Sequence, residues 1–538
     1  MSRVYAAVIA ALVVASISSA QQPTFSVVES TIADMQTAMR QGRVTSRGIV
    51  QQYLDRIAKY DDRLNAIITL NPRALDEADA RDRERAQGKV RGPLHGIPIA
   101  LKDNIHTTDM PTTGGARAFK GFVPPYEATL TKNLRDAGAI IIAKTNMTEL
   151  ANWIANGMPG NYNGLAGYGF NPYDPRPDPR EETNDGRPAL NAGGSSSGAG
   201  TAANFWVANV GTETSGSILT PANQTMVVGI KPTVGRISRY GIIPITADQD
   251  TAGPMARTVA DAAILLGVLE GGAADPRDPA TRACPRVPNS DYSRFLNRRG
   301  LAGARIGIPR AGFVDESRHG ALLRDAIAQL RQQGATIVDP ADIPQQPPPV
   351  CRDEGGTRGK DVNCSIVFKY GMKRDFNAWL ASLGPASPIK TLTELREWNL
   401  AHRAEGAIKY GQAQLDNSDA VDLERDRDRY RADRATDVRV TGADGIDAVM
   451  TRARLDALMF PGSTGAAVAA KPGYPTVIVP FAFVPNAPQP PFPPGFDAKP
   501  APLGVSFTGR ACSEPRLIEI AYAFEQATKR RRPPPEFP

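Results

Sequence analysis

The chain has 538 residues, of which 41% are hydrophobic and 22% are charged, so it can bury a large core without help from disulfides or metals. Its formal net charge of +7 is spread over 63 basic and 56 acidic residues, which argues against a nucleic-acid-binding function. One basic group, Lys529 to Arg532, precedes a proline-rich end, and we interpret it as a solvated tail and not as a phosphate-binding patch.

The first twenty residues (1–20) predict an export signal. Arg3 gives a positive start, residues 4–17 form an apolar run, and Ser18-Ser19-Ala20 places small residues before Gln21. The run is short for a membrane span, and no later segment has the roughly 20 uninterrupted apolar residues that spanning requires. We therefore expect a cleaved signal peptide and a periplasmic or secreted protein with no stable membrane span; an uncleaved anchor is the alternative.

Helical and strand-like patterns alternate after this segment. Residues 128–137 have helical spacing, end at Gly138 and lead into an apolar strand at 139–143. Residues 322–333 repeat the pattern before Gly334 and a strand at 335–338. Further strands are predicted at 96–101, 305–308, 457–460 and 476–479. The alternation predicts an α/β fold layered around one largely buried sheet.

No segment has the composition of a domain linker. The proline-rich stretches 339–350 and 485–502 are expected to be long surface loops, because helix or strand patterns resume after each. The charged run 422–434 predicts a solvated helix face. The loop 171–188 fits either the rim of a pocket or a solvated loop.

Four cysteines fit an exported protein with one or two disulfides. Cys284, Cys351, Cys364 and Cys512 allow three full pairings, among which the sequence does not choose, and Cys351–Cys364 is the preferred local bridge. The chain has only four histidines and neither an HExxH nor a CxxC motif, so we expect no zinc site.

The segment 191–221 is the most informative part of the chain. It is rich in Gly, Ser and Thr, yet apolar and helical segments flank it, so it does not resemble a flexible linker. Its two hydroxyl clusters, 195–197 and 214–217, lie beside glycines that let backbone N–H groups approach a ligand. This composition suits a serine nucleophile next to an oxyanion hole.

A serine nucleophile needs a base, and histidines are scarce. The strand-like run 96–104 places Lys102 near its end, where desolvation would favour the neutral amine. A lysine at a strand end is usually exposed or ion-paired, so this position alone is weak evidence.

Four segments taken together resemble the amidase signature family, and most of all its bacterial peptide-amidase-type members. They are GIPIALKDNI at 96–105, GGSSSGAG at 193–200, GTETSGSILTPA at 211–222 and the stretch that begins GIKPTVGRIS at 229–263. The resemblance implies one large domain over residues 21–538, with a central mixed β-sheet flanked by helices. It also implies a hydrolase of carboxylic amides that needs no cofactor or metal.

The resemblance further implies a Ser-cisSer-Lys triad. Ser217 would be the nucleophile that forms an acyl-enzyme, and Lys102 would be the base. Ser195 would carry protons between them and would follow Gly194 through a cis peptide bond. Ser196 would support the lysine, or would cap the following helix together with its neighbour Ser197.

The oxyanion hole would consist of the backbone N–H groups of Thr214, Ser215, Gly216 and Ser217. Two features depart from the family pattern. Ser195 and Ser217 are 22 residues apart, about two fewer than expected, and the shortening falls in the helix-like segment TAANFWVAN. It leaves Ser196 as the alternative bridging residue. Ser215 stands where many relatives have glycine or aspartate.

The expected substrate is a peptide C-terminal amide or a small or aryl amide. An esterase, a carbamate hydrolase or an acyl transferase with the same triad is the alternative, as is a non-catalytic exported binding protein. The GxGxxA pattern at 198–203 follows no apolar strand, which argues against a dinucleotide site. The sequence does not predict the oligomeric state.

Overall fold

A computed structural model describes residues 25–183, 185–193, 198–352 and 363–538. Within them, eleven strands form one mixed sheet in the order β1-β3-β2-β6-β8-β7-β12-β13-β11-β9-β10. The strands of this sheet are β1 (Ile67–Leu70), β2 (Pro98–Lys102), β3 (Ile140–Thr145), β6 (Ala208–Glu213), β7 (Val228–Lys231), β8 (Thr251–Ala256), β9 (Arg305–Gly307), β10 (Thr336–Val338), β11 (Ala457–Pro461), β12 (Thr476–Val484) and β13 (Ala501–Thr508). A separate hairpin pairs β4 (Tyr162–Asn163) with β5 (Gly167–Tyr168).

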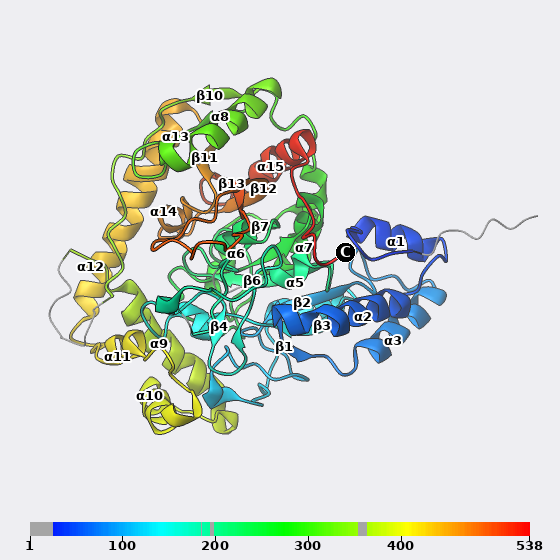
Figure 1. The fold of residues 1–538 in the computed structure, drawn as a ribbon, viewed down its shortest axis with the longest axis horizontal. Coiled ribbons are helices and arrows are strands. Elements are labelled where there is room, and N and C mark those ends of the chain that lie inside the picture. The colour runs from blue at the N-terminus through cyan, green and yellow to red at the C-terminus, as the bar shows by residue number, and fades with distance from the viewer. Residues whose placement is uncertain (1–24, 184, 194–197, 353–362) are drawn as a thin grey trace, which may run out of the picture.

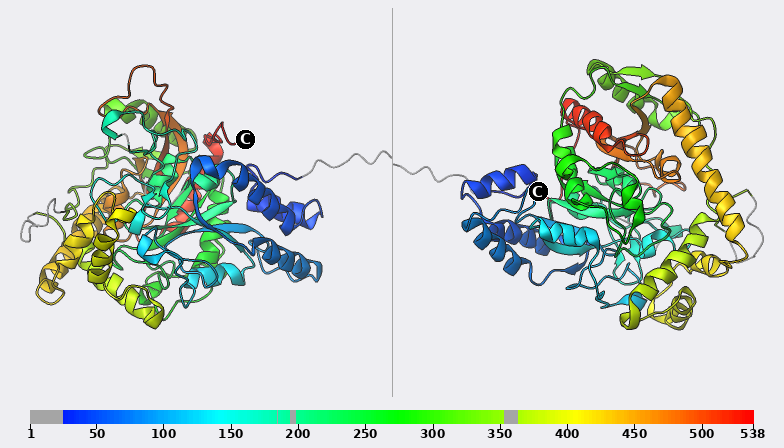
Figure 2. Two further views of the ribbon diagram at one scale, coloured as in Figure 1. Left: turned by 60° about the horizontal axis from the view of Figure 1, so that its bottom comes forward. Right: turned by 180° about the vertical axis from the view of Figure 1, so that it is seen from behind.

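Helices flank this sheet (Figure 1). They are α1 (Ile32–Arg40), α2 (Ser46–Leu64), α3 (Ala74–Ala86), α4 (Thr129–Asp136), α5 (Ala199–Ala202), α6 (Leu219–Gln224), α7 (Val259–Glu270), α8 (Glu316–Gln332), α9 (Val367–Ser382), α10 (Leu392–Ala401), α11 (Ala413–Asp419), α12 (Arg427–Val438), α13 (Ala448–Ala453), α14 (Ala466–Ala470) and α15 (Glu514–Thr528). Helices α1–α3 lie at one edge of the molecule, and α9–α12 lie at the opposite edge in all views (Figure 2). The predicted class, a single α/β domain with a mixed sheet flanked by helices, is confirmed.

The centre of the sheet is fully buried because its strands are apolar on both faces. Every residue of β2, β3 and β6 is buried. Strand β2 runs parallel to both neighbours, β3 and β6, so these three strands end at the same edge of the sheet. That edge is where the polar residues of the candidate site gather.

Glycines end the predicted helices as expected. Gly138 follows α4 with a φ of +81°, and Gly334 follows α8 with a φ of +87°, so both adopt the left-handed conformation that glycine favours. The strands predicted after them are β3 and β10. Only residues 427–434 of the charged run 422–434 lie in helix α12, most of whose side chains are at least partly exposed; residues 422–426 precede the helix. The stretches 339–350 and 485–500 are loops, as predicted.

One part of the serine-rich region was predicted wrongly. The helix-like segment TAANFWVAN is helical only in α5, which ends before Asn204 takes a φ of +60°. Trp206 is buried, and the chain then enters β6 between β2 and β8. The end of this segment is therefore a strand and not a helix, because it pairs with β2 and β8 in the middle of the sheet.

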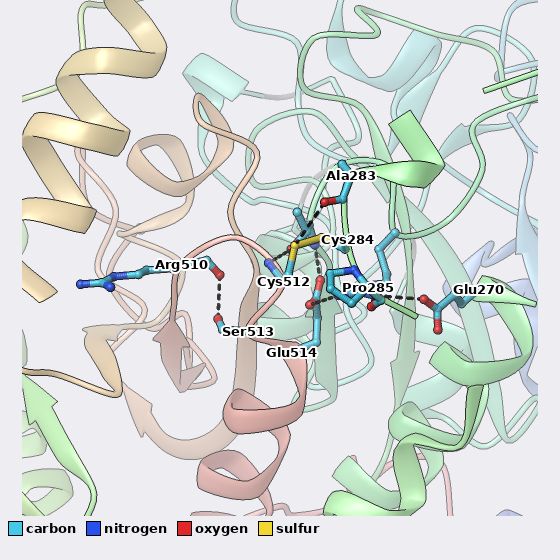
Figure 3. Close-up of a disulfide and its surroundings, with 10 residues drawn as sticks. Glu270, Ala283, Cys284, Pro285, Arg510, Cys512, Ser513 and Glu514 are labelled. Carbon is cyan, nitrogen blue, oxygen red and sulfur yellow. Dashed lines mark hydrogen bonds and ion pairs between the residues drawn. A yellow bond between two sulfur atoms is a disulfide. The ribbon is translucent and has the colours of Figure 1, made fainter. Parts of the chain in front are cut away.

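Both disulfides are formed. Cys351–Cys364 is the predicted local bridge, and Cys284–Cys512 joins segments 228 residues apart. Figure 3 shows that Glu270 and Glu514 lie near the long-range bridge. Both carboxylates bind the buried guanidinium of Arg236, at 3.1 and 2.9 Å, so this bridge adjoins a buried ionic cluster.

The basic group near the C-terminal end is only partly a solvated tail. Arg530 and Arg532 are exposed, but the guanidinium of Arg531 binds the carboxylate of Glu29 at 2.6 Å. Phe537 is buried and lies 5.5 Å, ring centroid to centroid, from Tyr60. The solvated-tail interpretation was wrong for Arg531, because this residue is docked on the loop before α1. The chain end beyond the basic group is docked too, through Phe537 on α2.

The loop 171–188 is built from three Asp-x-Arg turns. In each turn the arginine N–H donates to the aspartate two residues earlier, and the guanidinium binds the same carboxylate. Each guanidinium also lies over an aromatic ring: Arg176 over Phe496, Arg180 over Phe492 and Arg187 over Tyr410.

These turns fasten the loop to another one. Arg176 donates to the carbonyl of Asp497 at 2.7 Å, and Arg180 donates to the carbonyl of Pro490 at 2.8 Å. The described part of 171–188 is therefore attached to the proline-rich loop 485–500 and is not a freely solvated loop. Among the described residues, no helix is long and apolar enough to cross a bilayer.

Candidate active site

Lys102 is the last residue of β2, and its side chain is completely buried. The ammonium group donates to Thr212 of the neighbouring strand β6, to Oγ1 at 2.7 Å and to the carbonyl oxygen at 3.2 Å. Burial lowers the pKa of Lys102 to about 7, although the charges of Asp250 and Glu213 act in the opposite direction. A large fraction of this amine is therefore neutral near pH 7 and able to accept a proton.

A second buried lysine, Lys144, has a counter-ion that Lys102 lacks among the described residues. Lys144 lies on the adjacent strand β3 and is also fully buried, but its Nζ lies 3.4 Å from the carboxylate of Asp103. It also donates to Thr112 Oγ1 at 2.7 Å. No described carboxylate lies within ion-pair distance of Lys102. Of these two lysines, therefore, only Lys102 lacks a counter-ion that would hold it in the charged form.

Ser217 lies in the turn between β6 and α6 and is partly exposed. The buried carboxylate of Glu213, the last residue of β6, fixes this turn. Its Oε2 accepts the backbone N–H groups of Ile218 at 2.8 Å and Leu219 at 2.9 Å. Glu213 thus caps the N-terminus of α6, and the residue placed directly before the cap is Ser217.

The predicted oxyanion-hole segment has the required backbone freedom. Gly216 has a φ of +91°, and a Cβ there would lie 3.1 Å from Thr220 Oγ1. The N–H groups of residues 215–217 donate to no described residue. Among the described residues, therefore, no acceptor competes for these donors with an oxygen that carries developing negative charge.

Asp250 fixes the start of that segment. Its carboxylate accepts the hydroxyl proton of Thr214 and the N–H groups of Ile245 and Thr246, at 2.9 and 3.0 Å. Gln249 donates to the carbonyl of Thr214 at 3.1 Å. Loss of hydration raises the pKa of the Asp250 carboxyl to about 7. Sequence reasoning missed Asp250, Thr212 and Gln249. All three lie inside the family-like motifs at 211–222 and 229–263, but no spacing indicated their partners.

Ser195 and Ser196 lie outside the described residues, as do Gly194 and Ser197. The glycines on either side of them pack against α6. A Cβ on Gly193 would lie 2.5 Å from the Cα of Pro221, and one on Gly198 would lie 2.3 Å from Thr225 Oγ1. Both approaches leave no room for a side chain. The chain therefore enters and leaves the first serine cluster against the helix that follows Ser217.

A cavity of about 350 Å³ adjoins the Lys102 side of this site. Thr212, Thr214 and Asn104 form part of its wall. Asn104 donates to Thr212 Oγ1 at 3.0 Å, so the hydroxyl that binds Lys102 also belongs to the cavity wall. Among the described residues, no group of three or more His, Cys, Asp or Glu side chains is arranged to hold a metal ion.

Comparison with known proteins identifies a family. Residues 48–518 match the family model described as Amidase. A probable amidase of Arabidopsis thaliana is 36% identical over 96% of this chain and 94% of its own length. The crystal structure of native peptide amidase from Stenotrophomonas maltophilia superposes with a TM-score of 0.81, at 37% identity over 94% of this chain and 98% of that one. A glutamyl-tRNA(Gln) amidotransferase subunit of Synechococcus is 31% identical over 94% of this chain and 98% of its own length.

Proposed function

Because the chain belongs to the amidase family and is an amide-hydrolysing enzyme, we propose that it cleaves its substrate through an acyl-enzyme on Ser217. Lys102 is the base in this proposal, and Ser195 carries protons between the two residues. The observation that carries the proposal is the buried Lys102 amine, which has no described carboxylate partner and whose β2 strand ends at the same sheet edge as the Ser217 turn.

The proposed reaction begins with proton transfer to Lys102. Neutral Lys102 accepts a proton from Ser195, which accepts the proton of Ser217 as its Oγ attacks the carbonyl carbon of the amide. The N–H groups of the 214–217 segment bind the oxyanion. The relay then runs in reverse, so the leaving nitrogen gains the proton as the C–N bond breaks. Water attacks the ester by the same route and releases the carboxylic acid and free Ser217.

The proposed substrates are C-terminal amides of peptides or other small or aryl amides. Support comes from the likeness to the peptide amidase of Stenotrophomonas maltophilia. The likeness to a component of an amidotransferase supports acyl transfer as a second candidate. Product analysis with water and an added amine as competing acceptors separates the two, because transfer yields a new amide and hydrolysis yields the acid.

The test of the nucleophile is labelling with a fluorophosphonate serine probe, followed by mass spectrometry of the peptides. The adduct is expected on Ser217, and Ser217→Ala should remove both labelling and turnover. Ser317→Ala, at an exposed serine on α8, is the matched control and should retain both. An adduct on any other serine, or a Ser217→Ala protein with normal turnover, would contradict the proposal.

We also propose that the protein acts outside the cytoplasm, in the periplasm or the medium. Support comes from the signal-like residues 1–20, which lie outside the described residues, and from two disulfides, which persist in oxidising compartments. The N-terminal sequence of the protein recovered from the extracytoplasmic fraction should begin at Gln21. Recovery of the uncleaved chain from the cytoplasm alone would overturn this proposal.

A further inference from the structure

The cavity beside Lys102 runs from a polar, largely buried floor to an exposed mouth. Thr212, Asn104 and Thr214 contribute to the floor and are buried. Ala378 on α9 and Ala247 on the loop before β8 also line the cavity, and both are exposed. The cavity is therefore open to solvent at one end and touches the proposed catalytic machinery at the other.

Aromatic and branched apolar side chains form one part of the wall between these ends. Tyr126 stacks on Tyr240 with ring centroids 4.9 Å apart, and Trp379 is held by a hydrogen bond from its Nε1 to His106 Nε2 at 2.9 Å. The remaining apolar wall residues include Ile242, Ile243 and Ile245. Such a wall favours a flat apolar group, which gains both burial and ring contacts.

The charged residues around the cavity are already neutralised by the protein. Arg239 binds Asp278 at 2.5 Å, Arg277 binds Asp275 at 2.9 Å, and Asp375 binds Arg374 at 2.7 Å. The carboxyl of Asp250 is satisfied by two N–H groups and a hydroxyl. A charged ligand would find no free counter-ion among these groups, so the wall favours a neutral one.

The cavity also lies within reach of the reacting bond. Thr214 is in its wall, and Ser217 follows Thr214 by three positions, so their Cα atoms are at most about 11 Å apart. Lys102 binds the wall residue Thr212 directly. A substrate whose amide meets Ser217 can therefore extend one side chain into the cavity.

We infer that this cavity is a specificity subsite that takes a neutral aromatic side chain of the amide substrate. The inference rests on the proposed function, because it requires the scissile amide to bind at Ser217. It narrows the substrate class to amides with an aromatic side chain next to the reacting carbonyl.

The test uses a matched pair of substrates, N-acetyl-phenylalaninamide and N-acetyl-alaninamide. The parent enzyme should hydrolyse the phenylalanine amide with a kcat/KM at least tenfold higher. Ala378→Trp narrows the mouth from an exposed position of α9 and should lower that kcat/KM about tenfold, mainly through KM. The alanine amide should change less than twofold. Ala247→Trp narrows the mouth from the loop before β8. It should likewise lower kcat/KM for the phenylalanine amide and leave kcat/KM for the alanine amide nearly unchanged.

Ala381→Trp is the control, since it places the same side chain at an exposed position of α9 that does not line the cavity. This variant should leave kcat/KM for both amides unchanged. Equal rates for both amides in the parent, or an equal loss on both amides in the two mouth variants, would overturn the subsite. A parent that hydrolyses neither amide and does not react with the serine probe would instead contradict the proposed function.

Discussion

Replacement of Lys102 by methionine should make the protein more stable while it abolishes acylation. In the unfolded chain the lysine holds its proton up to a pKa of about 10.5, but in the folded protein burial lowers this pKa to about 7. Between these values the folded protein binds fewer protons than the unfolded chain, so parent stability rises with pH in this window. Burial of the protonated lysine therefore lowers the free energy of unfolding. This destabilisation is largest below pH 7, where it reaches about 5 kcal/mol, and it disappears above about pH 10.5.

Lys102→Met lacks this destabilisation and keeps an apolar chain of similar length. The difference in unfolding free energy between variant and parent should shrink by about 3 kcal/mol from pH 6 to pH 9. An unfolding entropy of about 2.1 cal/mol/K per residue makes this about 3 °C in Tm for a chain of this size. Thermal unfolding of both proteins at the two pH values measures it. A difference in Tm that stays the same at pH 6 and pH 9 would show that Lys102 does not titrate in this window.

Three further predictions concern the same region and the fold around it. Asp250→Asn should shift the rising limb of the plot of kcat/KM against pH to lower pH, because the charge of Asp250 raises the pKa of Lys102 in the parent. Variant and parent should not differ in this way below pH 7, where Asp250 of the parent is protonated. Gly216→Ala should lower kcat about 100-fold with little change in KM, because a side chain at a φ of +91° strains the backbone and displaces the oxyanion donors. Steady-state kinetics measures this, and an unchanged kcat would contradict the prediction. Replacement of Cys284 and Cys512 by serine should cost about 5 kcal/mol of stability, against about 3 kcal/mol for the local bridge, because the long-range bridge closes the longer loop; equal losses of Tm would contradict this loop-entropy argument.

Features set by short stretches of chain could be predicted from the sequence. The apolar run before Lys102 indicated a buried strand, and β2 ends at that residue. Gly138 and Gly334 marked helix ends because a positive φ suits glycine and costs other residues energy. The Cys351–Cys364 bridge also spans only a short segment, and it was the preferred local pair.

Features that depend on distant partners could not be predicted. Thr214 and Asp250 are 36 residues apart, and nothing in either segment indicates that they bind each other. The segment after the first serine cluster has local helical character, but its place between β2 and β8 makes it a strand after a single helical turn. The stacking of Arg176 on Phe496 joins residues of two loops whose compositions predict only exposure.

The paired loops 171–188 and 485–500 also bear on how this enzyme can be re-engineered. A loop moved alone into a homologous scaffold would bring Arg176 and Arg180 without Phe496 and Phe492, or the rings without the guanidinium groups. The backbone carbonyls that these arginines bind would be lost as well. Recombination libraries should therefore draw their crossover points so that both loops come from one parent, and chimaeras that split the pair should be recovered less often as folded protein.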